Sequence, residues 1–262
     1  MADPAFDLTA AVAQIAHEAG QMALARWRTD FRRWEKTPGS PVCEVDLDVD
    51  RMLRARLEGL LPDAGWLSEE TVDNTDRLAR EAVWVVDPID GTRDYIRGRE
   101  GWAVSVALVR NGEVVLGVLD APARRERWTA TRGQGAWRNG VALHAGMRSA
   151  LSGARVPTDA LPKIDRHLTI VHKPNSIALR MAMVAADEAD LVATLRWGNE
   201  WDIAAAAVIA VEAGAGVSDA LGGTLRYNKP DPTAFGVMVA APGIHDEALA
   251  WIRPRAEAAS IR

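Results

Sequence analysis

The chain has 262 residues, of which 48% are hydrophobic and 26% charged, a balance typical of a folded domain or of two fused subdomains. Its 36 acidic residues outnumber its 31 basic residues, which argues against a nucleic-acid polymer as partner because such proteins usually carry a basic field. A single cysteine, Cys43, excludes an intramolecular disulfide framework.

The longest apolar run covers the nine residues 203–211, whereas a membrane-spanning helix needs about 20. We therefore expect no membrane insertion. No basic segment precedes the first apolar stretch, so we expect a cytoplasmic location. The ten tryptophans outnumber the three phenylalanines and two tyrosines, and core packing is the simplest explanation for most of them.

Apolar residues at helical spacing predict a first helix over residues 8–23 and a second helix containing Val49, Leu53 and Leu57. The prolines and glycine between the two predict a loop over residues 36–43. Strands are predicted at 82–86, 102–109, 113–119 and 126–131, and Asn111-Gly112 joins the middle two as a hairpin. The first part of the chain therefore reads as helices packed on an antiparallel sheet.

The second part alternates helices with short strands, which predicts a mixed sheet with helices on both faces. Helices are expected at about 176–186, at 200–213 and from about 244 onwards. Strands are expected near 168–171, 190–195, 215–219 and 235–241. We therefore expect an α+β or α/β fold with two subdomains, residues 1–145 and 146–262, which are not independent of each other.

The segment Asp87–Thr92 carries the strongest chemical signal, because a wholly apolar strand runs directly into it. Pro88 interrupts strand pairing and Gly91 permits a sharp turn, so the carboxylates of Asp87 and Asp90 can converge with the Ile89 carbonyl. Converging hard oxygen atoms suit Mg²⁺ or Ca²⁺ better than zinc. The alternative is an ordinary turn in which Asp87 caps the chain and Asp90 lies in solvent.

Three further acidic residues have both a chemical and a structural interpretation. Glu69, in Ser68-Glu69-Glu70, is either a ligand or part of a solvated charge pair. Asp202 opens the alanine-rich helix and can equally close a capping box with Asn199. Asp46 lies where the second helix starts, so N-capping is an alternative there too.

Together these motifs resemble the inositol monophosphatase superfamily of metal-dependent, lithium-sensitive phosphatases. The matching segments, which follow the family's order and span nearly the whole chain, are Leu67–Glu70, Trp84–Thr92, Trp201–Ala205 and Glu212–Gly214. The resemblance implies a layered αβαβα sandwich, a homodimer and the hydrolysis of a small-molecule phosphate monoester.

The resemblance also implies a role for each matching residue. Two or three Mg²⁺ ions would be held by five residues: Glu69, Asp87, Asp90, Asp202 and, through its carbonyl, Ile89. Thr92, supported by Asp46, would orient and deprotonate the attacking water. The backbone amides of Gly91 and Thr92 would hold the phosphate at a helix N-terminus.

Two features near the motifs complete the expected site. Cys43 stands where the family usually has threonine, which implies a weaker hydrogen bond beside the catalytic groups. Trp84 and Trp201 adjoin the ligand aspartates in sequence, so we expect them to pack the walls that hold those aspartates.

The substrate is less clearly indicated. Arg93-Asp94-Tyr95-Ile96 is closer to the Lys-Glu-Phe-Ile of bacterial 3′(2′),5′-bisphosphate nucleotidases than to the Thr-Asn-Phe of inositol monophosphatases. Ser176 and Arg180 resemble a serine and a lysine that contact the nucleotide in those nucleotidases, and an arginine fork can hold a second phosphate. The alternative for Arg180 is the solvated side of its helix.

We therefore expect hydrolysis of 3′(2′),5′-adenosine bisphosphate to AMP. The alternative substrates are inositol-1-phosphate and other sugar-like alcohol phosphates, such as histidinol phosphate or fructose bisphosphate. A metal-binding regulatory protein without activity is a third possibility, against which Asp87, Asp90, Thr92 and Asp202 argue because all four are intact.

Overall fold

The largest sheet divides the molecule and carries much of the candidate site. This computed structural model describes residues 7–260. The seven strands, in spatial order, are β3 (Gly65–Ser68), β4 (Ala82–Asp90), β5 (Ala103–Arg110), β6 (Glu113–Ala121), β7 (Glu126–Thr131), β8 (Ala136–Arg138) and β9 (Val141–Ala142). All neighbours are antiparallel except β3 and β4, which pair in parallel. The predicted hairpin is confirmed, and both Asn111 and Gly112 have the positive φ that its turn requires.

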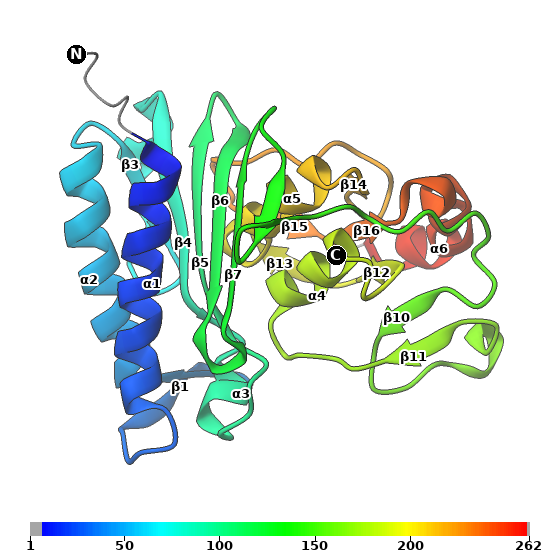
Figure 1. Ribbon diagram of the computed structural model, residues 1–262, viewed down its shortest axis with the longest axis horizontal. Helices are drawn as coiled ribbons and strands as arrows, with labels where there is room; N and C mark the ends of the chain where they lie inside the picture. Colours follow the sequence, from blue (N-terminus) through cyan, green and yellow to red (C-terminus); the bar gives the residue numbers. More distant parts are fainter. Residues whose placement is uncertain (1–6, 261–262) are drawn as a thin grey trace.

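Two long helices cover one face of this sheet, as Figure 1 shows: α1 (Leu8–Arg26) and α2 (Glu44–Leu60). Both confirm the predicted helices. Trp84 and Val86 of β4 belong to the apolar cluster beneath these helices, whereas Val83 and Val85 belong to the cluster on the other face. Trp84 therefore packs beneath α1 and α2 on the face opposite to Asp87, because residues three apart on a regular strand point to opposite faces. Its expected role in supporting the wall that holds Asp87 stays a prediction.

The segment between α1 and α2 is a hairpin rather than the predicted loop. β1 (Arg33–Thr37) pairs antiparallel with β2 (Ser40–Cys43) around Pro38-Gly39. No residue of β1 is buried, so the strand has none of the alternating apolar pattern by which a half-buried strand is found. The Pro-Gly signal correctly marked the turn but missed its two short strands.

Two helices cover the other face of the sheet: α4 (Ile177–Ala185) and α5 (Glu200–Glu212). Ser176 caps α4 by accepting a hydrogen bond from the Leu179 amide. Because α5 is rich in alanine, its backbone approaches β6 closely at Gly117, where an added Cβ would lie 2.5 Å from the Ala205 carbonyl oxygen.

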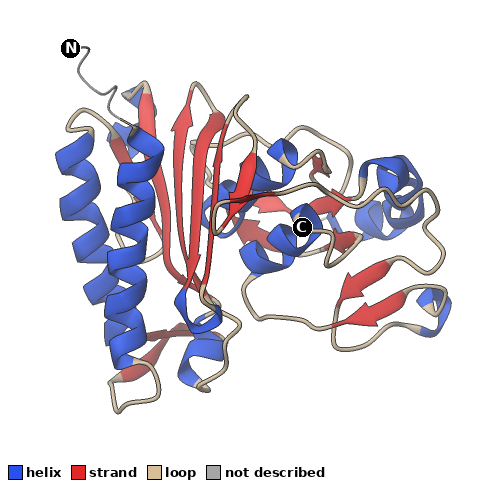
Figure 2. Cartoon of the chain, in the orientation of Figure 1, coloured by secondary structure: helices blue, strands red, loops and turns tan. Residues whose placement is uncertain are grey.

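Smaller sheets and a last helix form the remainder (Figure 2). β12 (Leu191–Ala193), β16 (Met238–Ala240) and β14 (Gly216–Ser218) form an antiparallel sheet in that order. β13 (Trp197–Asn199) pairs antiparallel with β15 (Thr233–Phe235), and β10 (Arg155–Pro157) pairs in parallel with β11 (Thr169–Val171). The outermost helix is α6 (His245–Ser260). The short helices are α3 (Thr92–Ile96), η1 (Thr75–Ala79), η2 (Pro122–Arg124), η3 (Lys163–Asp165) and η4 (Pro242–Ile244).

The layers therefore run helix, sheet, helix, sheet, helix, which confirms the expected αβαβα arrangement (Figure 1). One apolar cluster contains Val85 and Trp128 from the first part of the chain and Ala182 and Ile209 from the second. The two parts therefore share a core, and the proposed boundary after residue 145 stays a prediction. Within residues 7–260, no helix combines the length and the apolar character needed to cross a bilayer.

Candidate active site

A cavity of about 410 Å³ opens where β3 and β4 meet the first turns of three helices. Acidic and basic side chains both line it. The acidic residues are Glu69, Asp87, Asp90 and Asp202, and the basic residues are Arg93, Arg180 and Arg196. Such a cavity combines groups that attract cations with groups that attract anions, which is the requirement of a site for a phosphate and its counter-ions.

A bulge in β4 brings two of these acids to the same face. Asp87 pairs with Ser105 and Asp90 with Ala103, so three steps along β4 match two steps along β5. The extra residue changes the alternation of side chains and lets both carboxylates face the cavity. The Asp87 carboxylate also accepts the Ile89 amide at 3.0 Å, which stabilises the bulge.

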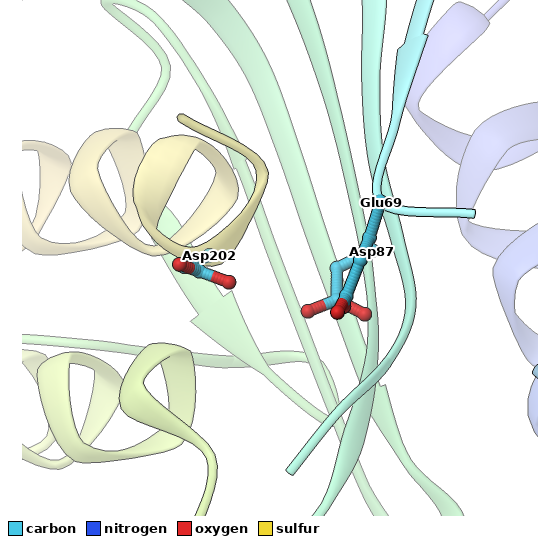
Figure 3. A group of neighbouring side chains, drawn as sticks. All are labelled: Glu69, Asp87 and Asp202. Atoms are coloured by element: carbon cyan, nitrogen blue, oxygen red, sulfur yellow. The ribbon is translucent and has the colours of Figure 1, made fainter. Parts of the chain in front are cut away.

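Glu69, Asp87 and Asp202 form the centre of the acidic cluster. Each offers an oxygen atom, and the three oxygen atoms lie within 4.8 Å of one another (Figure 3). Asp202 reaches the cluster from the first turn of α5 while its Oδ2 accepts the Asn199 amide at 2.8 Å. Asp202 can therefore cap α5 and belong to the acidic cluster at the same time, whereas the sequence presented these two roles as alternatives.

Burial and mutual repulsion make this cluster a poor place for unneutralised charge. Burial, followed by the charges of Glu69 and Asp90, raises the pKa of Asp87 well above its ordinary value. Burial and the charge of Asp90 raise the pKa of Asp202 to about 8. A divalent cation would remove this penalty, and carboxylate oxygens are the ligands that hard cations prefer. The donor set therefore fits the metal site expected from the sequence.

Asp90 lies beside the trio and connects it to α4. Its Oδ2 accepts the Ser176 hydroxyl at 2.5 Å and the Ala178 amide at 2.8 Å, and its Oδ1 accepts the Ile177 amide at 3.3 Å. Asp90 is only 6% exposed, so the alternative that places it in solvent is wrong. Burial is the main cause that raises its pKa to about 6.

Ser176 does not lie where the resemblance suggested. Its side chain is fully buried, its hydroxyl donates to Asp90, and it does not line the cavity. The serine orients a carboxylate and caps α4 instead of facing a substrate, because Asp90 occupies the position above the helix N-terminus. The expected contact between Ser176 and substrate is therefore corrected.

Thr92 and Asp46 are in contact, as expected. The Thr92 hydroxyl lies 3.2 Å from Asp46 Oδ1 and 2.9 Å from the Ile89 carbonyl oxygen, and it can donate its one proton to either. Asp46 Oδ2 accepts both the amide of Cys43 at 2.9 Å and its thiol at 2.8 Å. Asp46 therefore closes the start of α2 and also faces Thr92, and burial raises its pKa to about 6.

Gly91 and Thr92 both line the cavity at the start of α3. Gly91 has a φ of 95°, and a Cβ there would lie 2.6 Å from the Gly101 carbonyl oxygen. Only glycine fits this position without strain, since both the backbone conformation and the space exclude a side chain.

The basic residues supply positive charge to the same cavity. Arg180 donates to the carbonyl oxygens of Ser176 at 3.3 Å and Asn175 at 3.2 Å. Within residues 7–260 neither Arg180 nor Arg196 forms a salt bridge. Burial lowers the pKa of Arg180. Arg180 thus lies in the cavity wall and not on a solvated helix face.

Several residues of the site were missed in the sequence, among them the lining residues Arg196 and Trp197. Lys36, on the exposed strand β1, donates to the carboxylates of Glu69 and Glu70, each at 2.8 Å. Asp50 accepts the hydroxyls of Ser68 at 2.5 Å and Thr71 at 2.8 Å, and so fixes the segment around Glu69. Glu69 and Glu70 are therefore not a solvated pair. Asp50 follows Asp46 by one helical turn, a spacing that could have drawn attention to it, whereas Lys36 has no comparable signal.

Comparisons with known proteins agree with this geometry. The sequence profile described as "Inositol monophosphatase family" matches residues 5–258. A curated Thermotoga maritima protein named fructose-1,6-bisphosphatase/inositol-1-monophosphatase is 32% identical over 79% of this chain and 82% of its own length. The 3′(2′),5′-bisphosphate nucleotidase CysQ of Salmonella typhimurium is 32% identical over 82% of this chain and 92% of its own.

The fold gives the same result. The solved structure of the Thermotoga maritima IMPase superimposes with a TM-score of 0.81 and 28% identity, covering 94% of this chain and 97% of that one. The family profile spans almost all of the chain, and the acidic cavity lies within the matched part. This chain therefore belongs to the inositol monophosphatase family and is a phosphatase, a hydrolase of phosphate monoesters.

Proposed function

We propose that this phosphatase is Mg²⁺-dependent and hydrolyses 3′(2′),5′-adenosine bisphosphate to AMP and phosphate. The observation that carries the proposal is the lining of the cavity. It combines an acidic cluster with two arginines, Arg180 and Arg196, that have no carboxylate partner among the described residues. An ester with two phosphates can interact with both groups. One phosphate would react at the acids, and the other would bind the arginines.

The metal ligands in this proposal are Glu69, Asp87, Asp90, Asp202 and the Ile89 carbonyl, holding two or three Mg²⁺ ions. When bound, these ions supply charge neutralisation of the phosphate and Lewis-acid activation of water. The acidic residues then serve as ligands and not as proton donors, which explains why a site without a histidine in its lining can work.

The proton movement falls to Thr92 and Asp46. The Thr92 hydroxyl would accept a proton from the attacking water while passing its own proton to Asp46 Oδ1, 3.2 Å away. The amide and the thiol of Cys43 hold the other oxygen of Asp46, so the acceptor oxygen keeps its direction. The amides of Gly91 and Thr92 would bind the phosphate that is transferred.

The second phosphate would bind Arg180 and Arg196. Burial lowers the pKa of Arg180, which means that its charge is poorly compensated. An incoming dianion would compensate this charge through a charge-assisted hydrogen bond, and no ion pair with a carboxylate would have to be broken. Trp197, which contacts the ring of Phe235 and is 41% exposed, also lines the cavity and offers a flat face for a purine base.

Relatives support both the leading substrate and its alternative. CysQ nucleotidases of Salmonella typhimurium and Aggregatibacter actinomycetemcomitans are 32% and 29% identical to this chain, and an inositol-1-monophosphatase of Rhizobium meliloti is 35% identical. Inositol-1-phosphate carries one phosphate and would leave the two arginines without an anionic partner. Fructose bisphosphate also carries two phosphates but has no base for the exposed ring of Trp197. Adenosine bisphosphate is therefore the leading substrate, and inositol-1-phosphate is the second candidate.

The deciding experiment compares kcat/KM for the two esters in the wild type and in Arg180→Gln and Arg196→Gln. We expect the wild type to prefer adenosine bisphosphate and each variant to lose about 10- to 100-fold on that ester, equivalent to one charged hydrogen bond. Turnover of inositol-1-phosphate should change little. A wild type that prefers inositol-1-phosphate, or variants that leave the ratio unchanged, would contradict this assignment.

Two properties follow from the family resemblance and can be measured on the same protein. Lithium in the millimolar range should inhibit phosphate release. Sedimentation analysis should give the mass of a homodimer.

A further inference from the structure

A buried arginine joins the two parts of the chain outside the cavity. The side chain of Arg77, in η1, is 1% exposed. Its guanidinium binds the Asp73 carboxylate through two hydrogen bonds of 2.7 and 2.8 Å. It also donates to the Asn228 side-chain oxygen at 2.6 Å and to the Lys229 carbonyl oxygen at 2.9 Å, across about 150 residues of sequence.

Glu200 holds the same loop from the other side. Its buried carboxylate accepts the Asn228 amide at 2.5 Å and the Lys229 amide at 3.1 Å. Its own amide donates to the Pro232 carbonyl oxygen at 2.9 Å. Residues 228–232 are thus fixed between Arg77 and the first residue of α5, and they lead into β15, which pairs with β13 immediately before that helix.

Each end of this arrangement carries one member of the acidic cluster. The helix that starts at Glu200 presents Asp202, and η1 packs on β3, which ends one residue before Glu69. The contact between η1 and β3 is close, since a Cβ on Gly65 would lie 2.9 Å from the Arg77 Cβ. The line of contact therefore runs from β3 through Arg77 and the loop to α5.

We infer that Arg77, Asn228 and Glu200 form a polar bridge that sets the separation of Glu69 and Asp202, and that Arg77 and Glu200 are positioning residues for the divalent cation. Neither lines the cavity. The two carboxylates come from different parts of the chain, so a rigid connection between their carriers pre-organises them for one ion. The inference rests on the proposed metal site.

The test is calorimetric titration of the metal-free protein with Mg²⁺ and with Mn²⁺, without substrate. Partners that orient ligands typically affect metal affinity by about 10- to 100-fold. We expect Arg77→Gln to raise the Kd by at least about 10-fold, and Glu200→Gln, which keeps the shape of the side chain, to act in the same direction. Arg77→Lys keeps the charge without the planar fork and should lie between wild type and Arg77→Gln.

Arg155 provides a matched control. It also binds a carboxylate through two hydrogen bonds, to Asp190 at 3.0 and 2.7 Å, and it donates to both the carboxylate and the backbone carbonyl of Asp187, the latter at 2.7 Å. Its side chain is 34% exposed, whereas that of Arg77 is 1% exposed. It lies in β10, which contributes no residue to the cavity. Arg155→Gln should therefore lower the melting temperature and leave the Kd for metal unchanged.

The outcomes distinguish a failure of the proposed metal site from a failure of the polar bridge. If the wild type binds neither metal, the proposed metal site itself is wrong. If the wild type binds metal and the Arg77 and Glu200 variants bind it equally well, or if Arg155→Gln weakens binding as much as they do, the polar bridge has no positioning role. If Arg77→Gln does not fold, Glu200→Gln and Arg77→Lys decide the question.

Discussion

At the scale of single residues, the site depends on side chains that have two partners at once. Asp46 accepts the Cys43 amide at the start of α2 and faces Thr92 with its other oxygen. Asp90 accepts hydrogen bonds from α4 while lying in the acidic cavity. For Asp46 the sequence admitted a capping role or a chemical role, and the structure is compatible with both, whereas the alternative for Asp90, a position in solvent, is excluded by its burial.

Thr92 offers a sharp test at this scale. Thr92→Ala removes the hydroxyl that would relay a proton to Asp46, so kcat should fall by about 10²- to 10⁴-fold, the usual contribution of such a group. Thr92→Ser keeps the hydroxyl and should retain most of the activity. Steady-state rates with saturating substrate and Mg²⁺ measure both, and equal rates for the alanine and serine variants would exclude the relay.

At the scale of elements, α5 depends on small residues for its position against the sheet. The glycine at position 117 of β6 leaves room for the backbone of Ala205 and the side chain of Val208. Since α5 carries Asp202 in its first turn, its distance from β4 also sets the distance of Asp202 from Asp87. The close approach thus links core packing to the geometry of the site.

Gly117→Ala should therefore be destabilising. A methyl group placed 2.5 Å from a carbonyl oxygen must displace α5, and such overpacking costs about 1–3 kcal/mol in the free energy of unfolding. Gly59→Ala, at an exposed site in α2 with no atom within 4 Å of the added Cβ, should be neutral or stabilising by up to about 1 kcal/mol. Urea denaturation followed by circular dichroism measures the two, and equal stability of both variants would contradict the packing argument.

Most elements could be predicted because their signals are local. The apolar periodicity of α1 and α2 and the Asn111-Gly112 turn each lie within one element or at its border. The hairpin of β1 and β2 could not be found in this way, since β1 is exposed along its whole length. The bulge in β4 also escaped prediction, because its position is defined by pairing with β5.

At the scale of the whole molecule, the two parts of the chain contribute opposite sides of one acidic cluster. Glu69 and Asp87 come from the first part and Asp202 from the second. The motifs identified these acids, but Lys36, Arg196 and the bridge from Arg77 to residue 228 depend on contacts between distant segments, for which a single sequence carries no pattern. Ser176 was identified too, yet its partner is Asp90 and not a substrate.

Gathering buried acids in this way makes stability depend on pH and on metal. The pKa values of Asp46 and Asp202 are raised to about 6 and about 8, so the folded protein binds more protons than the unfolded chain between about pH 4 and pH 8. Without metal, the free energy of unfolding should therefore fall as the pH rises through this range. Acids whose pKa values are lowered, such as Glu44 and Asp190, change their protonation below this pH range, so they do not offset the fall in the free energy of unfolding.

Bound Mg²⁺ keeps the acids ionised at lower cost, so it should stabilise the protein more as the pH rises. The melting temperature with Mg²⁺, minus that with a chelator, should be larger by several degrees at about pH 8 than at about pH 5. Asp202→Asn should reduce this pH dependence because it removes an acid whose pKa is raised to about 8. A difference that is the same at both pH values would show that these carboxyls do not titrate in this range.

The most direct test of the proposed mechanism is phosphate release by the purified protein as a function of free Mg²⁺, for the wild type and Asp87→Asn. We predict that the wild type hydrolyses adenosine bisphosphate or inositol-1-phosphate only with Mg²⁺, that a chelator stops the reaction, and that Asp87→Asn, while still folded, is at least about 100-fold slower. Phosphate release that persists in chelator, or an Asp87→Asn protein with wild-type activity, would contradict the assignment of the acidic cluster as the catalytic metal site.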